Sequence, residues 1–128
     1  MGYTYKQKIL LIKKIIHRYQ CASYLIDCMN YDNHYASHTL SVREAPVHSV
    51  SYYYNKRIDK IDEAKRLIYL INQIFVLIGK ESEEIIRHDF MMYDKEWYLD
   101  YYSKATYYRK RKEAIEQFVK YLLVFLEF

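Results

Sequence analysis

The chain has 128 residues, of which 52% are hydrophobic and 28% charged, with only two glycines and one proline. This length suits a single domain with a modest core, and the scarcity of turn residues and of strand-type alternation predicts an all-α fold. No apolar run approaches the length of a membrane span and no signal peptide is evident, so we expect a cytoplasmic protein with no membrane partner.

The net charge of +4 is unevenly distributed along the chain. Residues 1–26 hold five cations and no acid, residues 103–112 hold another five cations and no acid, and the rest of the chain is net acidic. Two basic segments around an acidic middle indicate localised anion-binding surfaces rather than general adhesion to anions.

Two residue types have an ordinary interpretation. Cys21 and Cys28 lie seven residues apart on a predicted helix, which is too far for a disulfide within that helix, so we expect buried thiols in a reducing compartment. The seventeen tyrosines are attributed to AT-rich coding, because composition alone is weak grounds for a function.

The first predicted helix covers residues 4–29. One stripe of positions recurs at three- and four-residue steps and is apolar except at Ser23: Ile9, Ile12, Ile16, Tyr19, Ser23 and Ile26. Residues 30–55 then lose this periodicity and contain several Asn and Ser residues and the single proline, which predicts a long loop. A loop of that length inside a compact domain is either mobile or functional.

The second predicted helix runs from Lys56 to Ile78, and its second half is apolar nearly all round. We expect that half to be the central element of the core. Gly79 follows at the position where a helix C-terminus favours a left-handed residue. Within the single domain 1–128, residues 1–79 are therefore predicted to form a helical scaffold.

Residues 80–128 are predicted to form a helix-turn-helix region. Ser82 is expected to cap a helix over 82–92, and Asp94 to cap a short helix over 95–102 that carries Trp97 into the core. Ser103 is expected to cap a last helix over 104–126. The inward arc of that helix holds Tyr107, Ala114, Ile115, Phe118, Tyr121, Leu122 and Phe125.

The start of this last helix predicts a nucleic-acid contact. A helix N-terminus already favours anions, so five cations after Ser103 oppose its dipole unless an anion binds there. Arg109 suits a guanine edge, Lys104 and Lys110 suit phosphates, and Thr106 suits a thymine methyl group. Arg111 lies nearer the core arc and could instead pair with an acid from the second or third helix. The candidate DNA-binding residues are Lys104, Ala105, Thr106, Tyr108, Arg109, Lys110 and Lys112.

Residues 82–122 resemble the C-terminal helix-turn-helix of small regulators related to sigma factor region 4. The pattern is similar to that of ArpU-like phage late-gene regulators and of a mycoplasma family of similar size: Trp97, then Ser103-Lys104-Ala105-Thr106-Tyr107-Tyr108-Arg109, then Ala114 and Phe118. The resemblance implies that Ser103 is the helix cap and that Tyr107, Ala114 and Phe118 belong to the core. It also implies RNA polymerase as a second partner.

These observations together predict a DNA-binding transcription regulator that acts on double-stranded DNA. The alternative is a helical protein-interaction module that forms a homodimer or larger oligomer through the apolar segment 121–126. A metal site at Cys28, His34, His38 and His48 is disfavoured because a second ligand pair is missing. No catalytic motif and no cofactor motif is recognisable, so we expect neither an enzyme nor a cofactor.

Overall fold

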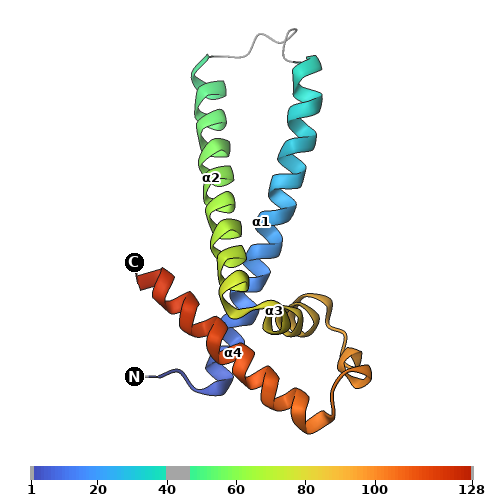
Figure 1. The fold of residues 1–128 in the computed structure, drawn as a ribbon. Coiled ribbons are helices and arrows are strands. Elements are labelled where there is room, and N and C mark those ends of the chain that lie inside the picture. The colour runs from blue at the N-terminus through green and yellow to red at the C-terminus, as the bar shows by residue number, and fades with distance from the viewer. Residues whose placement is uncertain (1, 40–46, 128) are drawn as a thin grey trace. The chain divides into compact units, whose positions relative to one another are not determined.

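The computed structural model describes the backbone of residues 2–39 and 47–127, and the side chains of residues 2–30 and 56–126. Within these ranges every regular element is a helix, which confirms the all-α prediction. The order is α1 (Tyr5–Thr39), α2 (Val47–Ile78), α3 (Lys80–Arg87), the π-helical turn η1 (His88–Met92), the 3₁₀ turn η2 (Trp97–Asp100) and α4 (Lys104–Glu127) (Figure 1).

The predicted loop over residues 30–55 is wrong for most of its length. α1 continues to Thr39 and α2 already begins at Val47, so residues 30–39 and 47–55 are helical, and residues 40–46 lie outside the described part of the chain. A started helix needs only favourable propagation from residue to residue, not a new nucleus. Residues 30–39 and 47–55 therefore remain helical although they lack the apolar periodicity that would indicate a packed helix face.

α1 begins with a reciprocal cap between Thr4 and Gln7. The Gln7 amide N–H donates to Thr4 Oγ1 at 3.2 Å, and the Thr4 amide N–H donates to Gln7 Oε1 at 2.9 Å. This is the capping-box arrangement, which pairs two backbone N–H groups that the first turn leaves without helical partners. It fixes where α1 starts.

The chain divides into two compact units. The first consists of Met1–Arg18 and Leu70–Phe128, and the second of Tyr19–Tyr69. The predicted helix-turn-helix region thus shares its unit with the first turns of α1 and the last turns of α2. Buried side chains of the second unit include Ala22, Met29 and Ala64. Both cysteines, Cys21 and Cys28, are exposed in that unit, so the expectation of buried thiols is wrong.

The core of the first unit gathers side chains from every helix of that unit. Ile12 and Ile16 of α1, Ile71 and Ile74 of α2 and Phe118 of α4 are almost completely buried. The Phe75 and Phe118 rings meet with centroids 5.8 Å apart, which joins α2 to α4. The predicted role of the second half of α2 as a core element is confirmed.

The connection from α2 to α3 depends on Gly79. Its φ of 92° and ψ of 162° lie in a region that is essentially restricted to glycine. The expected positive φ is confirmed, although the conformation is not the left-handed helical one. α3 then starts at Lys80 with Gly79 as its N-cap and no side-chain cap, so Ser82 lies inside the first turn and is not the predicted cap.

The segment between α3 and α4 differs from the predicted pair of helices. The expected helix over 82–92 ends as a π-helical turn, and Tyr93 closes it in the left-handed conformation with φ 55°. The expected helix over 95–102 is only the 3₁₀ turn η2, and Asp94 does not cap it because its N-cap is Glu96. The rings of residues 97, 98 and 102 fix this segment through contacts with α4 and η1, so an α-helix is not required there.

Candidate functional site

The first turn of α4 is capped by Ser103, as predicted. Ser103 Oγ accepts a hydrogen bond from the Thr106 amide N–H at 3.3 Å and donates to Thr106 Oγ1 at 2.8 Å. The Tyr107 amide N–H donates to the Ser103 carbonyl at 2.9 Å. The cap therefore satisfies a backbone donor at the point where the candidate DNA-binding residues begin.

One face of α4 is buried and the other is exposed. Tyr107, Ala114 and Phe118 are 3%, 0% and 0% exposed, which confirms the core positions that the resemblance implies. Most of the candidate DNA-binding residues lie on the exposed face, and two are half-buried. The exposed ones are Lys104, Ala105, Tyr108, Arg109 and Lys112; the half-buried ones are Thr106 and Lys110.

Lys110 is already paired within the protein. Its Nζ lies 2.5 Å from Oε1 of Glu81 in α3, and the Tyr102 hydroxyl donates to the same oxygen at 3.0 Å. These hydrogen bonds lower the pKa of Glu81, and the bond to Glu81 raises the pKa of Lys110. Both partners are partly exposed, so the pair contributes little to stability. Its effect is to direct Lys110 toward α3 rather than toward a phosphate.

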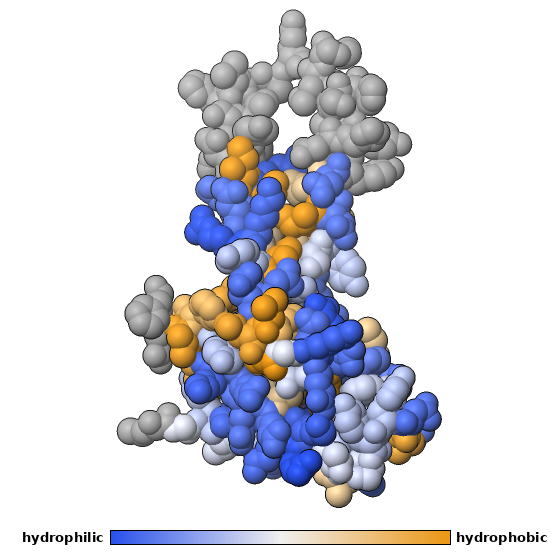
Figure 2. Space-filling view, in the orientation of Figure 1, coloured by the Kyte–Doolittle hydropathy of each residue, from blue (hydrophilic) through white to orange (hydrophobic). Residues whose placement is uncertain are grey.

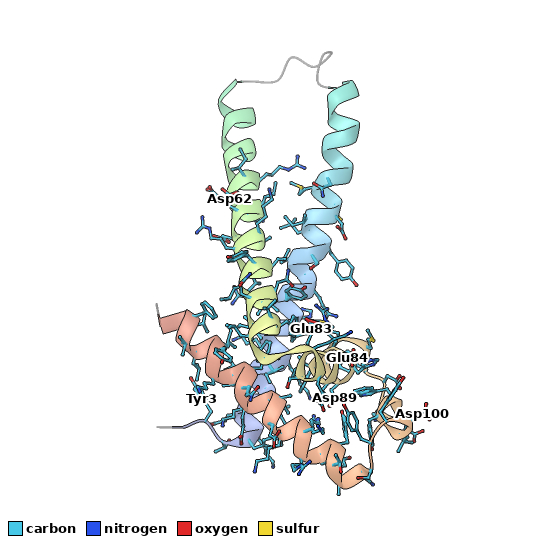
Figure 3. All side chains as sticks on the ribbon, viewed as in Figure 1. Tyr3, Asp62, Glu83, Glu84, Asp89 and Asp100 are labelled. Atoms are coloured by element: carbon cyan, nitrogen blue, oxygen red, sulfur yellow. The ribbon has the colours of Figure 1, made fainter. Side chains whose placement is uncertain are left out.

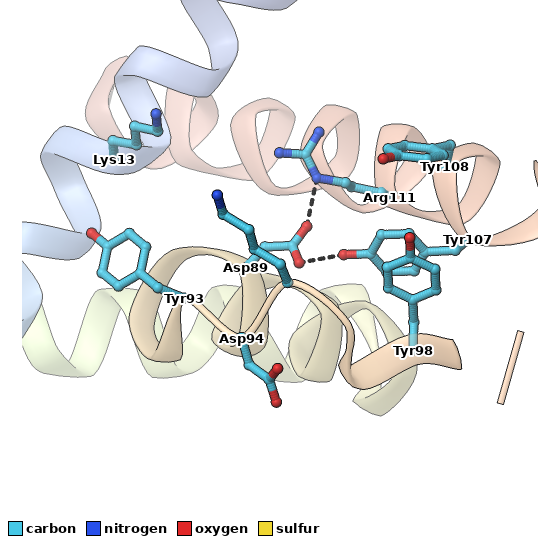
Figure 4. Close-up of a pocket in the computed structure, with 9 residues that line it drawn as sticks. Lys13, Asp89, Tyr93, Asp94, Tyr98, Tyr107, Tyr108 and Arg111 are labelled. Atoms are coloured by element: carbon cyan, nitrogen blue, oxygen red, sulfur yellow. Dashed lines mark hydrogen bonds and ion pairs between the residues drawn. The ribbon is translucent and has the colours of Figure 1, made fainter. Parts of the chain in front are cut away.

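Asp89 of η1 receives three side-chain donors. Arg111 Nε donates to Oδ2 at 2.5 Å, and the Tyr107 hydroxyl and Trp97 Nε1 both donate to Oδ1, the latter at 3.4 Å. Figure 3 labels Asp89, and Figure 4 marks the bonds that it accepts from Arg111 and Tyr107. The prediction that Arg111 could pair with an acid from the third helix is confirmed, because Asp89 falls within the segment predicted as that helix.

The Asp89 cluster is shielded from solvent. The side chains of Arg111 and Asp89 are 21% and 12% exposed, so their attraction is screened less than that of a surface pair. Burial and the hydrogen bond to Asp89 raise the pKa of Tyr107. Burial opposes the charge of Arg111, yet the bond to Asp89 raises the pKa of Arg111 overall. Arg111 also donates to the Tyr5 hydroxyl at 2.9 Å, which ties α1 to the cluster.

Two aromatic stacks surround the cluster. Trp97 stacks on His88 with centroids 4.2 Å apart, and Tyr98 stacks on Tyr107 with centroids 3.8 Å apart and planes 3° from parallel. Trp97 is half-buried, whereas Tyr98 is buried, so the core position of the short segment belongs to Tyr98 rather than to the predicted Trp97. Several of the tyrosines thus have specific contacts, which a purely compositional interpretation does not foresee.

A cavity of about 380 Å³ opens beside the Asp89–Arg111 pair. Lys13 of α1, Lys95 of the connection between η1 and η2, and Tyr108 of α4 line it together with that pair. Figure 4 labels Lys13 and Tyr108 beside Asp89 and Arg111. Its lining therefore comes from parts of the first unit that are far apart in sequence. None of the lining residues outside α4 is among the predicted site residues.

Sequence reasoning missed the two acids that hold α4, Asp89 and Glu81. A usable signal existed for Asp89, because it lies four residues after Ile85 and three after Ile86, both of which are buried. A carboxylate on the apolar stripe of a helix requires a partner, and Arg111 near the core arc of α4 is the matching cation. Glu81 had no comparable signal, since acids in a first helical turn are common.

The comparisons with known proteins return no similar protein. No family model matches the chain, and no curated protein or solved structure is significantly similar to it. Among the described residues, no group of three or more His, Cys, Asp or Glu side chains is arranged to hold a metal ion, and His34, His38 and His48 fall outside the described side chains. None of the described helices is long and apolar enough to cross a membrane.

Proposed function

We propose that this protein is a DNA-binding transcription regulator that places the first turns of α4 in the major groove of double-stranded DNA. One observation carries the proposal. Lys104, Arg109 and Lys112 all lie on the exposed face at the start of α4, and none of them has a carboxylate partner within the described residues. The two other cations of the segment, Lys110 and Arg111, are paired with acids of the protein itself.

The spacing of the exposed residues suits a groove. Lys104, Tyr108 and Lys112 follow at four-residue steps and so form one row about 12 Å long, given a rise of about 1.5 Å per residue. Ala105 and Arg109 form a neighbouring row. The major groove is about 12 Å wide and admits one α-helix, so both rows can approach the bases or the adjoining phosphates.

The roles follow from side-chain chemistry. The guanidinium of Arg109 can donate two parallel hydrogen bonds to a guanine, whereas Lys104 and Lys112 act as point charges for phosphates. Ala105 permits close approach of the helix backbone. Lys110 and Thr106 become positioning residues in this proposal, because Lys110 binds Glu81 and the hydroxyl of Thr106 accepts a hydrogen bond from Ser103.

The cellular setting of this proposal comes from the resemblance to regulators with a sigma-region-4-like motif. That resemblance implies a cytoplasmic regulator of transcription with RNA polymerase as a second partner. The exposed cations of the first turns of α1, Lys6, Lys13 and Lys14, offer a second basic surface for DNA or for the polymerase. Pull-down of purified RNA polymerase with wild-type protein and with a Lys6→Ala/Lys14→Ala variant distinguishes these two partners. Loss of capture in the variant indicates that this surface binds the polymerase, and unchanged capture indicates DNA.

Fluorescence anisotropy on labelled AT-rich and GC-rich duplexes across a salt series tests DNA binding. The double variant Arg109→Ala/Lys112→Ala is expected to flatten the dependence of log affinity on log salt by about one, because Lys112 contributes a phosphate contact. Loss of Arg109 should in addition weaken binding to the GC-rich duplex more than to the AT-rich one. Lys60→Ala/Lys65→Ala removes the same charge from exposed positions of α2 and serves as the control. Equal salt slopes for all three proteins would contradict the proposal.

A second candidate function is self-association, which the apolar end of α4 favours. Val124, Phe125 and Leu126 are 46%, 40% and 57% exposed, and Figure 2 shows apolar surface beside the C-terminal end of the chain. Sedimentation equilibrium of the wild type and of Phe125→Ser/Leu126→Ser tests it. A concentration-dependent oligomer that this variant abolishes, together with salt slopes unaffected by Arg109→Ala/Lys112→Ala, would favour the interaction module over the regulator.

A further inference from the structure

The cavity beside Asp89 is large enough for a small ligand. Its volume of about 380 Å³ falls at the lower end of the range of about 300–1,000 Å³ that small-molecule sites occupy. Lys13, Lys95 and Arg111 reach it from α1, from the segment between the two short turns and from α4. Three cations from separate parts of the sequence thus converge on one concave surface.

The charges around the cavity are not balanced by its acids. Asp89 lies in the wall, but Arg111 compensates its charge and two neutral donors occupy Oδ1. Asp94 also lines the cavity but is exposed, and Figure 4 shows its carboxylate pointing away from Asp89, so the three cations still exceed the two acids by one charge. Neither Lys13 nor Lys95 has an ion-pair partner among the described side chains. The mouth of the cavity therefore favours an anion.

The remaining walls are aromatic. Tyr98 and Tyr107 form a parallel stack, and the Tyr108 ring stands at 61° and 63° to those two rings. Tyr108 is 51% exposed and borders the cavity, so one of its faces is accessible to a ligand. Aromatic faces beside lysines are the combination that stacks a base while a cation holds its phosphate.

We propose that this cavity binds a nucleoside phosphate, with the phosphate at Lys13 and Lys95 and the base against Tyr108. The nucleotide has two sources, a free mononucleotide or one unit of a strand that α4 holds. Only the second source rests on the proposed DNA binding. Tyr108 belongs both to the cavity and to the exposed face of α4, so a bound strand could extend from one to the other.

Isothermal titration with adenosine 5′-monophosphate, adenosine and inorganic phosphate tests the proposal. The monophosphate is expected to bind more tightly than either fragment, because only it reaches both the lysines and the ring. Lys13→Gln and Lys95→Gln should each weaken it about tenfold, the effect of losing one charge-assisted contact. Lys120→Gln, at an exposed position of α4 that does not line the cavity, is the matched control and should leave binding unchanged.

The same variants on a labelled duplex separate the two sources. If the monophosphate does not bind, but Lys13→Gln and Lys95→Gln weaken duplex binding more than Lys120→Gln does, the cavity takes a nucleotide of a strand. If the monophosphate binds as expected and no duplex binds, the cavity proposal stands and the proposed DNA binding fails. The proposal is overturned if neither Lys13→Gln nor Lys95→Gln weakens the binding of the monophosphate or of the duplex.

Discussion

Asp89 in η1 and Arg111 in α4 form an ion pair across 22 positions of sequence, and a tyrosine hydroxyl binds each partner. Asp89 accepts from Tyr107, while Arg111 donates to Tyr5 at the start of α1. Together with the buried apolar face of α4, these contacts hold the rotation of α4 about its own axis. That rotation decides that Arg109 and Lys112, rather than their neighbours, face solvent.

Removal of the Asp89 carboxylate should destabilise the fold. In Asp89→Ala, the Arg111 guanidinium and the Tyr107 hydroxyl lose their shared partner while they remain largely shielded from water. We expect a loss of about 2–3 kcal/mol in the free energy of unfolding, measured by urea denaturation followed by circular dichroism. Asp100→Ala, at an exposed position of η2, is the control and should change stability by less than about 0.5 kcal/mol.

A side chain at position 79 should strain the turn between α2 and α3. Apart from Gly79 itself and its two chain neighbours, no residue has an atom within 4 Å of a Cβ built at this position, so steric contact is not the source of the strain. The source is the backbone φ of 92°. We expect Gly79→Ala to lower the free energy of unfolding by about 1–3 kcal/mol. Gly2→Ala, where the added methyl group also meets nothing, should leave the melting temperature unchanged. Equal stability of the two variants would contradict this reading of the turn.

Two serines that sequence patterns treat alike should respond differently to mutation. Ser103 caps α4 through the Thr106 amide, whereas Ser82 lies within α3 and caps nothing. Ser103→Ala should therefore cost about 1 kcal/mol of unfolding free energy, and Ser82→Ala much less. Thermal unfolding of both variants under one set of conditions makes the comparison, and a larger effect at position 82 would count against the described caps.

Stability should fall in alkaline solution, in part because of Tyr107. Burial and Asp89 raise its pKa in the folded protein, whereas in the unfolded chain a tyrosine ionises near its ordinary pKa of about 10. Above that pH the unfolded state holds fewer protons than the folded state, so the free energy of unfolding decreases by up to about 1.4 kcal/mol per pH unit for this group. The contribution is fully present below about pH 10.

Urea titrations at several pH values from neutral to strongly alkaline measure this slope. Tyr107→Phe should make the decline above about pH 10 shallower, although it also removes a hydrogen bond and so lowers stability at every pH. Tyr101→Phe, at a position that is 74% exposed, is the control and should keep the wild-type slope. An unchanged slope in Tyr107→Phe would show that other groups cause the alkaline loss.

If α4 binds DNA as proposed, breaking the Glu81–Lys110 pair should increase the affinity for DNA. Glu81→Gln removes the counter-charge of Lys110 and leaves this cation free to meet a phosphate. The salt dependence of duplex binding should steepen by up to about one unit of slope. Glu84→Gln removes an equal charge from α3 without a contact to Lys110 and should have a smaller effect. A weaker complex in Glu81→Gln would mean that the pair orients α4 for binding.

Sequence reasoning succeeds in this chain where one helix face is buried. The start of α4 at Ser103 and the burial of Tyr107, Ala114 and Phe118 follow from a cap residue and a three- to four-residue period. The positive φ of Gly79 follows from the same local rules. Such features depend on a few neighbouring residues, so the local sequence contains the information that determines them.

It fails where the structure depends on contacts between distant residues. Nothing local distinguishes a π-helical turn at 88–92 from an α-helix, because the turn is held by what Asp89 and His88 contact elsewhere. The extension of α1 beyond residue 30 was missed for a related reason, since an apolar period is a sign of packing and not a requirement for a helix. The cavity is lined by residues of α1, of α4 and of the segment between α3 and α4. Such a combination of distant residues has no signature in one stretch of sequence.

The protein contains a single tryptophan, and that residue donates to Asp89 while it stacks on His88. Its tryptophan emission, which lies at longer wavelength than that of the seventeen tyrosines, therefore comes from one side chain of the Asp89 cluster. Any rearrangement of η1 against α4 alters the surroundings of this indole. The unlabelled protein thus carries its own optical reporter, placed next to the contacts that determine which face of α4 is presented.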